Sequence, residues 1–338
     1  MVAGGSPVHL GPVATGGDGS PSNDHTFFAT PLIALALGTT HLYATDSGSS
    51  DIAFFNINTS NCQPTLVADY PSGGSGIFGL GIAISPNGKF LYASNGARAS
   101  TLTVLPINSD GSLGSRVQTL SLGAVLSTMV ITPDGKTLIA TQAGVTNQVT
   151  AYAVNQSTGK LKLASGVTTQ GAADGVAIDS HSKFVYVGNG GDGGSADVQV
   201  IEIGTGSKLT YIADFVFNGI DNPADIPGSS NCLLLSPSGK LLYFSNQVEA
   251  DVITLNVDPQ SGTLSFNSVV NDGEAFVDEP SQLAMNPNGS LIFTGDFNSD
   301  GAPAMGILRT SSGGTLTLVG TFPLVANAPA TSIAAGVF

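Results

Sequence analysis

The sequence predicts an all-β fold built from repeated units, and three observations support this prediction. A turn of the type Ser-Pro-Asn-Gly-Lys, followed by an apolar strand, occurs at five places, which begin at Ser85, Thr132, Asp179, Ser236 and Asn286. Charged residues make up only 10% of the 338 residues, and Gly is abundant at 44. The apolar runs between the turns are short, as in strands. A repeat of this size indicates supersecondary units that must stack to bury their apolar faces.

Residues 80–122 show the elements expected in each unit. Leu80–Ile84 is a run of small apolar residues, typical of a strand buried on both sides. After the first turn, in which Gly supplies the left-handed conformation, Phe90–Ser94 forms the second strand. Thr101–Ile107 alternates between apolar and polar residues, and Val117–Leu122 follows as an outer strand. The same order of elements can be traced from Ile33, Thr128, Gly175, Cys232 and Gln282.

Four antiparallel strands per unit, with the smallest residues on the first, describe the blade of a β-propeller whose first strand faces the axis. We expect one domain over residues 1–338, with blades that start near residues 31, 80, 127, 174, 231 and 281. An inner strand over Thr331–Val337 and an outer strand over Val8–Gly16 suggest a seventh, closing blade built from residues 331–338 and 1–30. Such closure leaves no free sheet edge. A ring of six blades is the alternative.

Composition restricts the partners and the compartment. The net charge of −14 disfavours nucleic acid and anionic membranes, which bind basic surfaces. The longest apolar run, Pro31–Leu37, is too short to span a bilayer, and no signal peptide is visible in residues 1–24. The scarcity of Lys and Arg resembles exported proteins, so we expect a secreted or periplasmic monomer. Cys62 and Cys232 lie at different points of the repeat, which favours free thiols over a disulfide.

The predicted topology sorts charges between the two faces of the ring. All seven lysines fall in or beside the first and third turns of the blades, as do Arg116 and Arg309, and only Arg98 is a base among the opposite loops. Those loops collect acids, namely Asp46, Asp51, Asp174, Asp192, Asp197, Asp221, Asp225, Glu249, Asp251, Glu274, Asp278, Glu279, Asp296 and Asp300. An acidic mouth would repel anions and admit cations or neutral polyols. The alternative is that Asp and Asn simply form good loops.

One polar residue per blade is expected at the mouth, three positions after the Tyr or its equivalent on the second strand. These residues are Asp46, Asn95, Gln142, Asn189, Asn246 and Asp296. Together with Arg98, Asp221 and Glu274 they are candidates for binding a ligand. The alternative is that each ties down its own loop by a local hydrogen bond.

Two connections are longer than their counterparts, Asn218–Asn231 and Asn271–Ser281. Long loops are where function concentrates. Their carboxylates Asp225, Asp278 and Glu279 are the candidates for general acid and base, a role that requires shifted pKa values. No serine-hydrolase or nucleotide-binding motif occurs in the sequence.

The segment Asp296–Gly301 matches the first half of a calcium loop, with oxygen ligands at Asp296, Asn298 and Asp300. The twelfth position, where an EF-hand has a bidentate Glu, is Ile307. Ca²⁺ is therefore a candidate metal at this loop, without the EF-hand geometry. A polar hairpin loop is the alternative, and no other cofactor is indicated.

The turn Ser85-Pro-Asn-Gly-Lys-Phe-Leu-Tyr92, followed by Ala93-Ser94-Asn95, resembles the lactonase-type seven-bladed propellers, which include 6-phosphogluconolactonases and carboxymuconate lactonising enzymes. The resemblance implies a lactonase-like hydrolase or isomerase. It also implies Arg-His pairs at the starts of inner strands. The matching positions here are Leu80-Gly81, Ser127-Thr128, Asp174-Gly175, Asn231-Cys232 and Ser281-Gln282. None of these positions is an Arg-His pair. The absence of the pairs, together with the acidic mouth, favours a neutral or cationic small molecule as the substrate. The alternative is a non-catalytic, secreted scaffold that binds a ligand or a protein.

Overall fold

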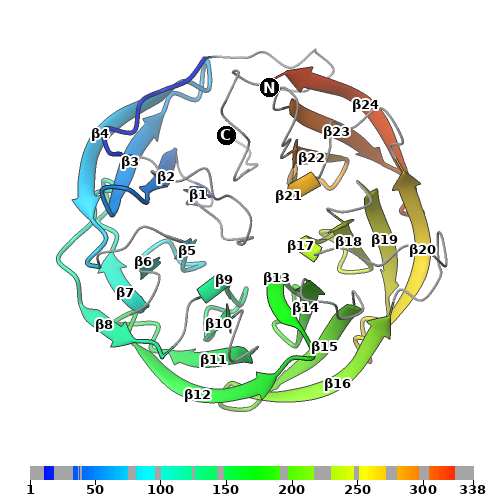
Figure 1. Ribbon diagram of the computed structural model, residues 1–338. Coiled ribbons are helices and arrows are strands. Elements are labelled where there is room, and N and C mark those ends of the chain that lie inside the picture. Colours follow the sequence, from blue (N-terminus) through cyan, green and yellow to red (C-terminus); the bar gives the residue numbers. More distant parts are fainter. Residues whose placement is uncertain are drawn as a thin grey trace.

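The computed structural model of the chain describes residues 11–18, 33–36, 38, 40–74, 81–95, 100–123, 126–142, 148–190, 197–216, 230–246, 251–271, 280–296 and 304–323. In these ranges the chain forms six antiparallel sheets of four strands each. Figure 1 shows the sheets as blades around a common axis, which confirms the predicted β-propeller architecture. Within the described ranges no helix is long and apolar enough to cross a membrane.

Blades are numbered here along the chain, blade 1 being β1–β4 and blade 6 being β21–β24. The first strands lie nearest the axis (Figure 1) and are β1 (Ile33–Leu35), β5 (Ile82–Ile84), β9 (Leu126–Ile131), β13 (Ala172–Ile178), β17 (Ser230–Leu235) and β21 (Pro280–Met285). The second strands are β2 (His41–Asp46), β6 (Phe90–Asn95), β10 (Thr137–Gln142), β14 (Phe184–Gly190), β18 (Leu241–Asn246) and β22 (Leu291–Asp296).

The third and outer strands complete each sheet. The third strands are β3 (Asp51–Ile57), β7 (Thr101–Pro106), β11 (Gln148–Val154), β15 (Asp197–Gly204), β19 (Asp251–Val257) and β23 (Ala304–Thr310). The outer strands are β4 (Pro64–Pro71), β8 (Gln118–Ser121), β12 (Leu161–Thr168), β16 (Lys208–Val216), β20 (Leu264–Asn271) and β24 (Leu316–Pro323). These bounds agree with the predicted starts of the blades within a few residues.

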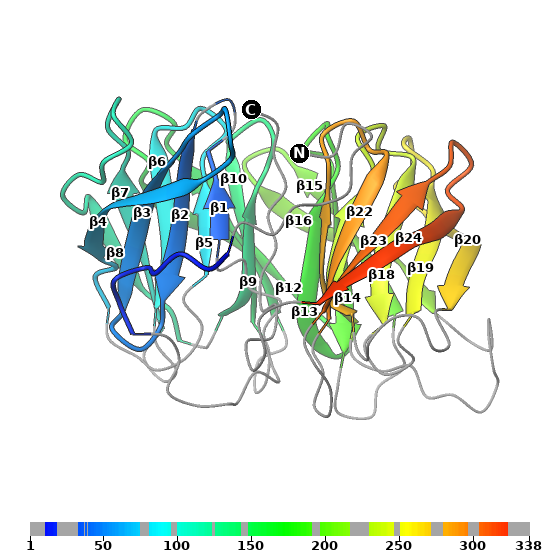
Figure 2. The same cartoon turned by 90° about the horizontal axis from the view of Figure 1, so that it is seen from above.

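The antiparallel order fixes two faces of the ring. The first turn of a blade joins its first and second strands, and the third turn joins its third and outer strands. Both lie on one side, which we call the turn face. The second strands end on the opposite side, which we call the mouth face; in the edge-on view of Figure 2, β2 points toward it. Glycine is favoured at the first turn by its left-handed conformation, since φ is +68° at Gly88 and Gly135.

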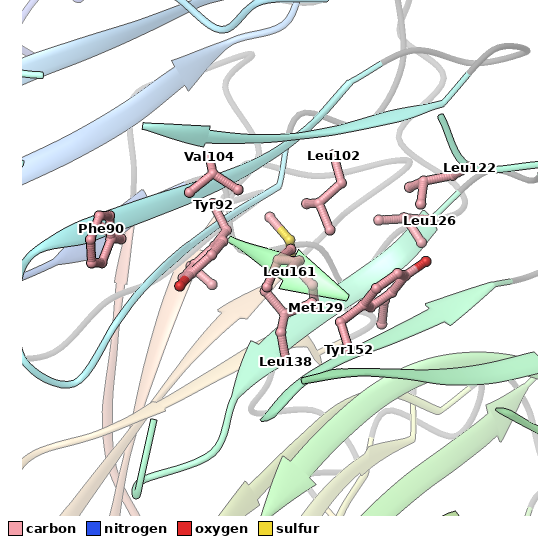
Figure 3. Packing of buried hydrophobic residues seen from close by; sticks show 12 residues of the cluster. Phe90, Tyr92, Leu102, Val104, Leu122, Leu126, Met129, Leu138, Tyr152 and Leu161 are labelled. Atoms are coloured by element: carbon pink, nitrogen blue, oxygen red, sulfur yellow. The ribbon is translucent and has the colours of Figure 1, made fainter. Parts of the chain in front are cut away.

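The core lies between neighbouring blades rather than at the axis. Clusters of buried side chains fill the interfaces of blades 1–2, 2–3, 3–4, 4–5 and 5–6. Figure 3 shows the cluster between blades 2 and 3, where Tyr92 and Leu102 of blade 2 meet Met129 and Leu138 of blade 3. Apolar residues alternate along the second and third strands, so that each of blades 2–5 contributes to two such clusters.

A second contact between blades recurs at the turn face. The third turn of one blade lies against the first residue of the preceding blade's second strand. At Gly159 an added Cβ would lie 2.6 Å from Cγ of Phe90, and at Gly262 it would lie 2.6 Å from Cδ1 of Phe184. Both glycines have positive φ, +71° and +76°. Glycine therefore allows the turn backbone to rest on the neighbouring aromatic ring.

Residues 11–18 correct one prediction. The part of the expected outer strand Val8–Gly16 that the structure describes is not a strand. Instead Val13 packs on the face of blade 1 that points away from blade 2, against Ala53 and Phe55. Gly48 N and Ser49 N both donate to the carbonyl of Asp18, at 2.9 and 3.2 Å. The segment thus covers part of blade 1 without strand pairing. The remaining residues of the proposed closing blade lie outside the described ranges.

Candidate functional site

The ends of the second strands bring the predicted polar residues to the mouth face. Asp46, Asn95 and Gln142 are the last residues of β2, β6 and β10, and Asn189 is the next to last of β14. All four side chains are buried, with 2–7% of their surface exposed. Asn246 and Asp296 end β18 and β22, and their side chains lie outside what the structure describes. The predicted placement at the strand ends is confirmed.

Asp46 and Asn95 each hold a neighbouring segment rather than their own loop. Ser72 follows the outer strand of blade 1, and its Oγ donates a hydrogen bond to Oδ1 of Asn95 in blade 2. In the same way Thr15 Oγ1 donates to Oδ1 of Asp46 at 2.7 Å. Thr15 is therefore placed on blade 1 as Ser72 is placed on blade 2. These two members of the set have a structural role that local loop chemistry did not predict.

Asp46 differs from Asn95 in carrying a charge. Burial raises the pKa of its carboxyl above the ordinary value; the hydrogen bond from Thr15 lowers it, and the nearby carboxylates Asp69 and Asp51 raise it. Its Oδ2 has no hydrogen-bond partner among the described residues. Because the folded state favours the protonated form, this group stabilises the fold at low pH, and that stability is lost as the pH rises through the raised pKa.

We therefore expect Asp46→Asn to melt at a higher temperature than the parent protein at about pH 7, with the difference shrinking toward about pH 4. The amide keeps an oxygen for Thr15 and removes the buried charge. The measurement is thermal unfolding across this pH range. Asn95→Asp is the reciprocal control, which should lose stability as the pH rises. Equal pH profiles for the parent protein and Asp46→Asn would contradict the account.

The mouth ends of the first strands carry β-bulges that the sequence reasoning missed. In blade 3 Ser127 is an extra residue on the first strand, because the pairing shifts between Thr141 and Gln142 of the second strand. In blades 4, 5 and 6 the extra residue lies at Asp174-Gly175, Asn231 and Ser281. Bulges re-aim side chains and are frequent beside active sites. They coincide with the positions at which the resemblance implies Arg-His pairs. The side chains of Asp174, Asn231 and Ser281 lie outside the described set.

Hydroxyl groups on the second strands fix these inner-strand ends. Gly81 N donates to Ser94 Oγ at 2.9 Å, and Cys232 N donates to Ser245 Oγ at 3.0 Å. In blade 3, Thr128 N donates likewise to Thr141 Oγ1 at 3.1 Å. Each hydroxyl precedes a residue of the polar set at the strand ends. A Ser or Thr directly before the polar residue at the end of the second strand is the sequence pattern from which these hydrogen bonds could have been predicted.

The lysines lie on the face that the sequence predicted, whereas the described acids lie on both faces, with Asp110, Asp134, Asp179 and Asp258 in turns of the turn face. The seven lysines lie in or beside first and third turns, namely Lys89, Lys136, Lys183 and Lys240, and Lys160, Lys162 and Lys208. Some pair with acids of the same face, such as Lys136 with Asp134 at 3.2 Å. Asp46, Asp51 and Asp251 lie at the mouth ends of β2, β3 and β19. Arg116 departs from the prediction, because its Nη1 donates at 2.8 Å to the carbonyl of Gly73, beyond the mouth end of β4.

Most of the proposed catalytic and ligand-binding loops lie outside the described residues. This holds for Arg98, Asp221, Asp225, Glu274, Asp278, Glu279, Asn298 and Asp300, and for the side chain of Asp296. Among the described residues no group of three or more His, Cys, Asp or Glu could hold a metal ion. The proposed calcium loop is not part of that set, so it stays a prediction.

Both cysteines are free, as predicted. Burial raises the pKa of the Cys232 thiol to about 11. Its Sγ lies 3.8 Å from the carbonyl oxygen of Leu283 in blade 6. A thiol with this pKa is protonated at neutral pH and is a poor nucleophile. Cys232 therefore packs between blades at the mouth end of β17 and is no candidate for covalent catalysis.

Comparison with known proteins adds a family. A family profile described as "Lactonase, 7-bladed beta-propeller" matches residues 39–178 and 195–330, which is most of the chain. No curated protein sequence matches the chain at a significant level.

Solved structures share the fold at low sequence identity. A Bacteroides fragilis protein assigned as a 6-phosphogluconolactonase has a TM-score of 0.71 and 21% identity, over 88% of this chain and 84% of its own. The periplasmic gluconolactonase of Pseudomonas aeruginosa has a TM-score of 0.69 and 19% identity, over 86% and 84%. Hydrazine synthase of Kuenenia stuttgartiensis has a TM-score of 0.68 and 16% identity, over 93% and 92%. These names differ, so the likeness concerns the fold and not a reaction.

Proposed function

Since the chain belongs to the lactonase family of seven-bladed β-propellers, we propose that it hydrolyses a neutral sugar-type lactone at the mouth face. The lactonase-like fold is shared with proteins named for two substrates, 6-phosphogluconolactone and gluconolactone. The charge of this chain's mouth is the observation that favours the second kind.

Carboxylates lie at the mouth ends of several described strands. Asp46, Asp51 and Asp251 end or begin strands at the mouth, whereas the lysines lie on the turn face. A phosphate group would meet carboxylates of its own sign there, and like charges in a site of restricted solvent access repel strongly. A neutral lactone lacks this penalty. Its hydroxyl groups can donate hydrogen bonds to the same carboxylates.

The proposed reaction needs one base and one acid. A carboxylate takes a proton from water as the water oxygen attacks the lactone carbonyl carbon. The bond between that carbon and the ring oxygen then breaks, and a protonated carboxyl gives the ring oxygen its proton. The product is the free hydroxy acid, and the base is then protonated and the acid ionised. Proton exchange with solvent returns both carboxyl groups to their starting states. Asp225, Asp278 and Glu279 are the candidates for these roles, and the acid requires a raised pKa of the kind that burial gives Asp46.

The test is hydrolysis of D-glucono-δ-lactone, which is measured as the rate of acid release above the spontaneous rate. We expect the parent protein to catalyse this hydrolysis. Of the variants Asp225→Asn, Asp278→Asn and Glu279→Gln, those that remove the general acid or the general base should lower kcat about a hundredfold. Lys89→Gln, on the opposite face, is the matched control and should leave kcat unchanged. A rate no higher than the spontaneous one would instead favour the non-catalytic binding scaffold.

The location of the protein follows from the same proposal. One relative of the fold is named as a periplasmic enzyme, and the low Lys and Arg content of this chain, 10 residues in all, is typical of exported proteins. We propose that the protein acts as a monomer in the periplasm or outside the cell. Fractionation of the native host, with the chain detected outside the cytoplasm, is the corresponding measurement.

A further inference from the structure

A pocket lies on the turn face between blades 2 and 3, on the side of the ring opposite the mouth. Its volume is about 230 Å³, and its lining includes Pro86, Phe90 and Tyr92 of blade 2 and Asp134, Val154 and Gln156 of blade 3. It is framed by the first turns of both blades and by the third turn of blade 3. No part of it belongs to the proposed lactone site.

Tyr92 lines this pocket from blade 2. The side chain is fully buried, with 0% of its surface exposed, and its hydroxyl has no hydrogen-bond partner in the described part of the chain. Figure 3 shows this oxygen on the side of the cluster next to Phe90, whereas the hydroxyl of Tyr152 points the opposite way. A buried donor without an acceptor is costly, so its presence at a cavity calls for an acceptor from outside.

Blade 1 shows one way in which the tyrosine at this position is satisfied, whereas in blade 4 the hydroxyl of Tyr186 has, like that of Tyr92, no partner among the described residues. Tyr43 occupies the equivalent position on β2, and its hydroxyl donates at 2.7 Å to the carbonyl of Gly111 in the third turn of blade 2. That turn is closed by the hydrogen bond from Asn108 N to the carbonyl of Ser112. A third turn of this length therefore presents a backbone acceptor to the preceding blade.

The corresponding turn of blade 3 is one residue longer. It is closed by the hydrogen bond from Asn155 N to the carbonyl of Lys160. Its Gly159 lies over the ring of Phe90. No carbonyl of the turn accepts from Tyr92, and the pocket lies beside the uncommitted hydroxyl. The difference in turn length thus explains why blade 2 has both an unpartnered donor and a cavity.

The remaining lining restricts the ligand. Phe90, Pro86 and Val154 provide apolar walls. The carboxylate of Asp134 already accepts from Thr132 Oγ1 and from Lys136 N and Nζ, so it offers no unpaired charge. Gln156 Nε2 is likewise committed, since it donates at 2.6 Å to the Asp134 carbonyl. Burial raises the pKa of Tyr92, which keeps its hydroxyl a donor at physiological pH.

We propose that this pocket binds a small, neutral and largely apolar molecule that presents a carbonyl or ether oxygen to the Tyr92 hydroxyl. Such a molecule leaves no polar group unpaired against the apolar walls. A polyhydroxylated sugar would bury hydroxyl groups there without partners, which disfavours it. The site is thus separate from the lactone site in both position and ligand chemistry.

The probe is cyclohexanone, a neutral six-membered ketone that has a carbonyl acceptor, has no hydrogen-bond donor and is not a lactone. Binding is followed by saturation-transfer NMR titration of the full chain. We expect saturable binding to the parent protein and a dissociation constant about tenfold higher for Tyr92→Phe, which loses one hydrogen bond. Tyr43→Phe is the matched control and should bind as the parent does.

Thermal unfolding of the two variants gives a readout independent of the probe. Tyr43→Phe should lower the melting temperature because it removes the bond to Gly111, whereas Tyr92→Phe should not. The proposal is overturned if the parent protein shows no saturable binding, or if Tyr92→Phe binds cyclohexanone as tightly as the parent protein does.

Discussion

Deletion of residues 1–18 is expected to lower the free energy of unfolding by about 4 kcal/mol. The described part of this segment buries Val13 against the outer face of blade 1, where Phe55 is only 3% exposed. It also satisfies Asp46 through Thr15. Removing it exposes apolar side chains to water and leaves a buried carboxyl without its donor, and both effects destabilise the fold.

The close fit of the segment explains why its glycines matter. A Cβ at Gly16 would lie 2.5 Å from Oδ2 of Asp69, and one at Gly17 would lie 2.7 Å from Oδ2 of Asp46. The matched control is deletion of residues 1–10, which leaves residues 11–18 in place, so that the difference between the two deletions gives the contribution of residues 11–18. Chemical denaturation measures both. Equal stabilities for the two deletions would show that residues 11–18 contribute nothing to blade 1.

Alanine at Gly159 is expected to lower the free energy of unfolding by about 3 kcal/mol. Two effects add up. The φ of +71° is unfavourable for a residue with a Cβ, and that Cβ would lie 2.6 Å from Cγ of Phe90. The ring is 7% exposed, so it has little room to move. Either the third turn or the interface of blades 2 and 3 must shift.

Gly206→Ala separates the two effects. Gly206 lies in the third turn of blade 4 with φ of +72°, and no heavy atom lies within 4 Å of an added Cβ. This variant carries the backbone strain without the clash, and should cost about 1 kcal/mol. Denaturation of both variants gives the difference. If the two alanines cost the same, the contact between the third turn and the preceding blade does not hold the blades together.

The repeat made the fold predictable because local chemistry determines each blade. The Pro-Asn-Gly-Lys turn needs a left-handed residue, and Gly88 adopts it. In blade 4 Ser182 occupies the same position with φ of 60°, so the repeat tolerates the loss of glycine there. Strand order and the two faces follow from this repetition, and with them the placement of the lysines on the turn face.

The hydrogen bonds at the mouth could not be predicted in the same way, because they join segments from different blades. The bond from Ser72 to Asn95 depends on how one blade stacks on the next, which no local pattern reveals. Tyr43 and Tyr92 have the same place in the repeat, yet a turn in the following blade decides which hydroxyl finds an acceptor. The likeness to solved structures at low sequence identity shows only the fold, and the chemistry depends on individual residues.

The central claim is that the mouth face selects a neutral lactone by its charge. The most direct measurement compares kcat/KM for D-glucono-δ-lactone and for its 6-phosphorylated form, at low and at high salt. We expect the neutral lactone to be preferred, and the preference to shrink as salt screens the carboxylates. A preference for the phosphorylated lactone, or one that salt does not change, would contradict the assignment.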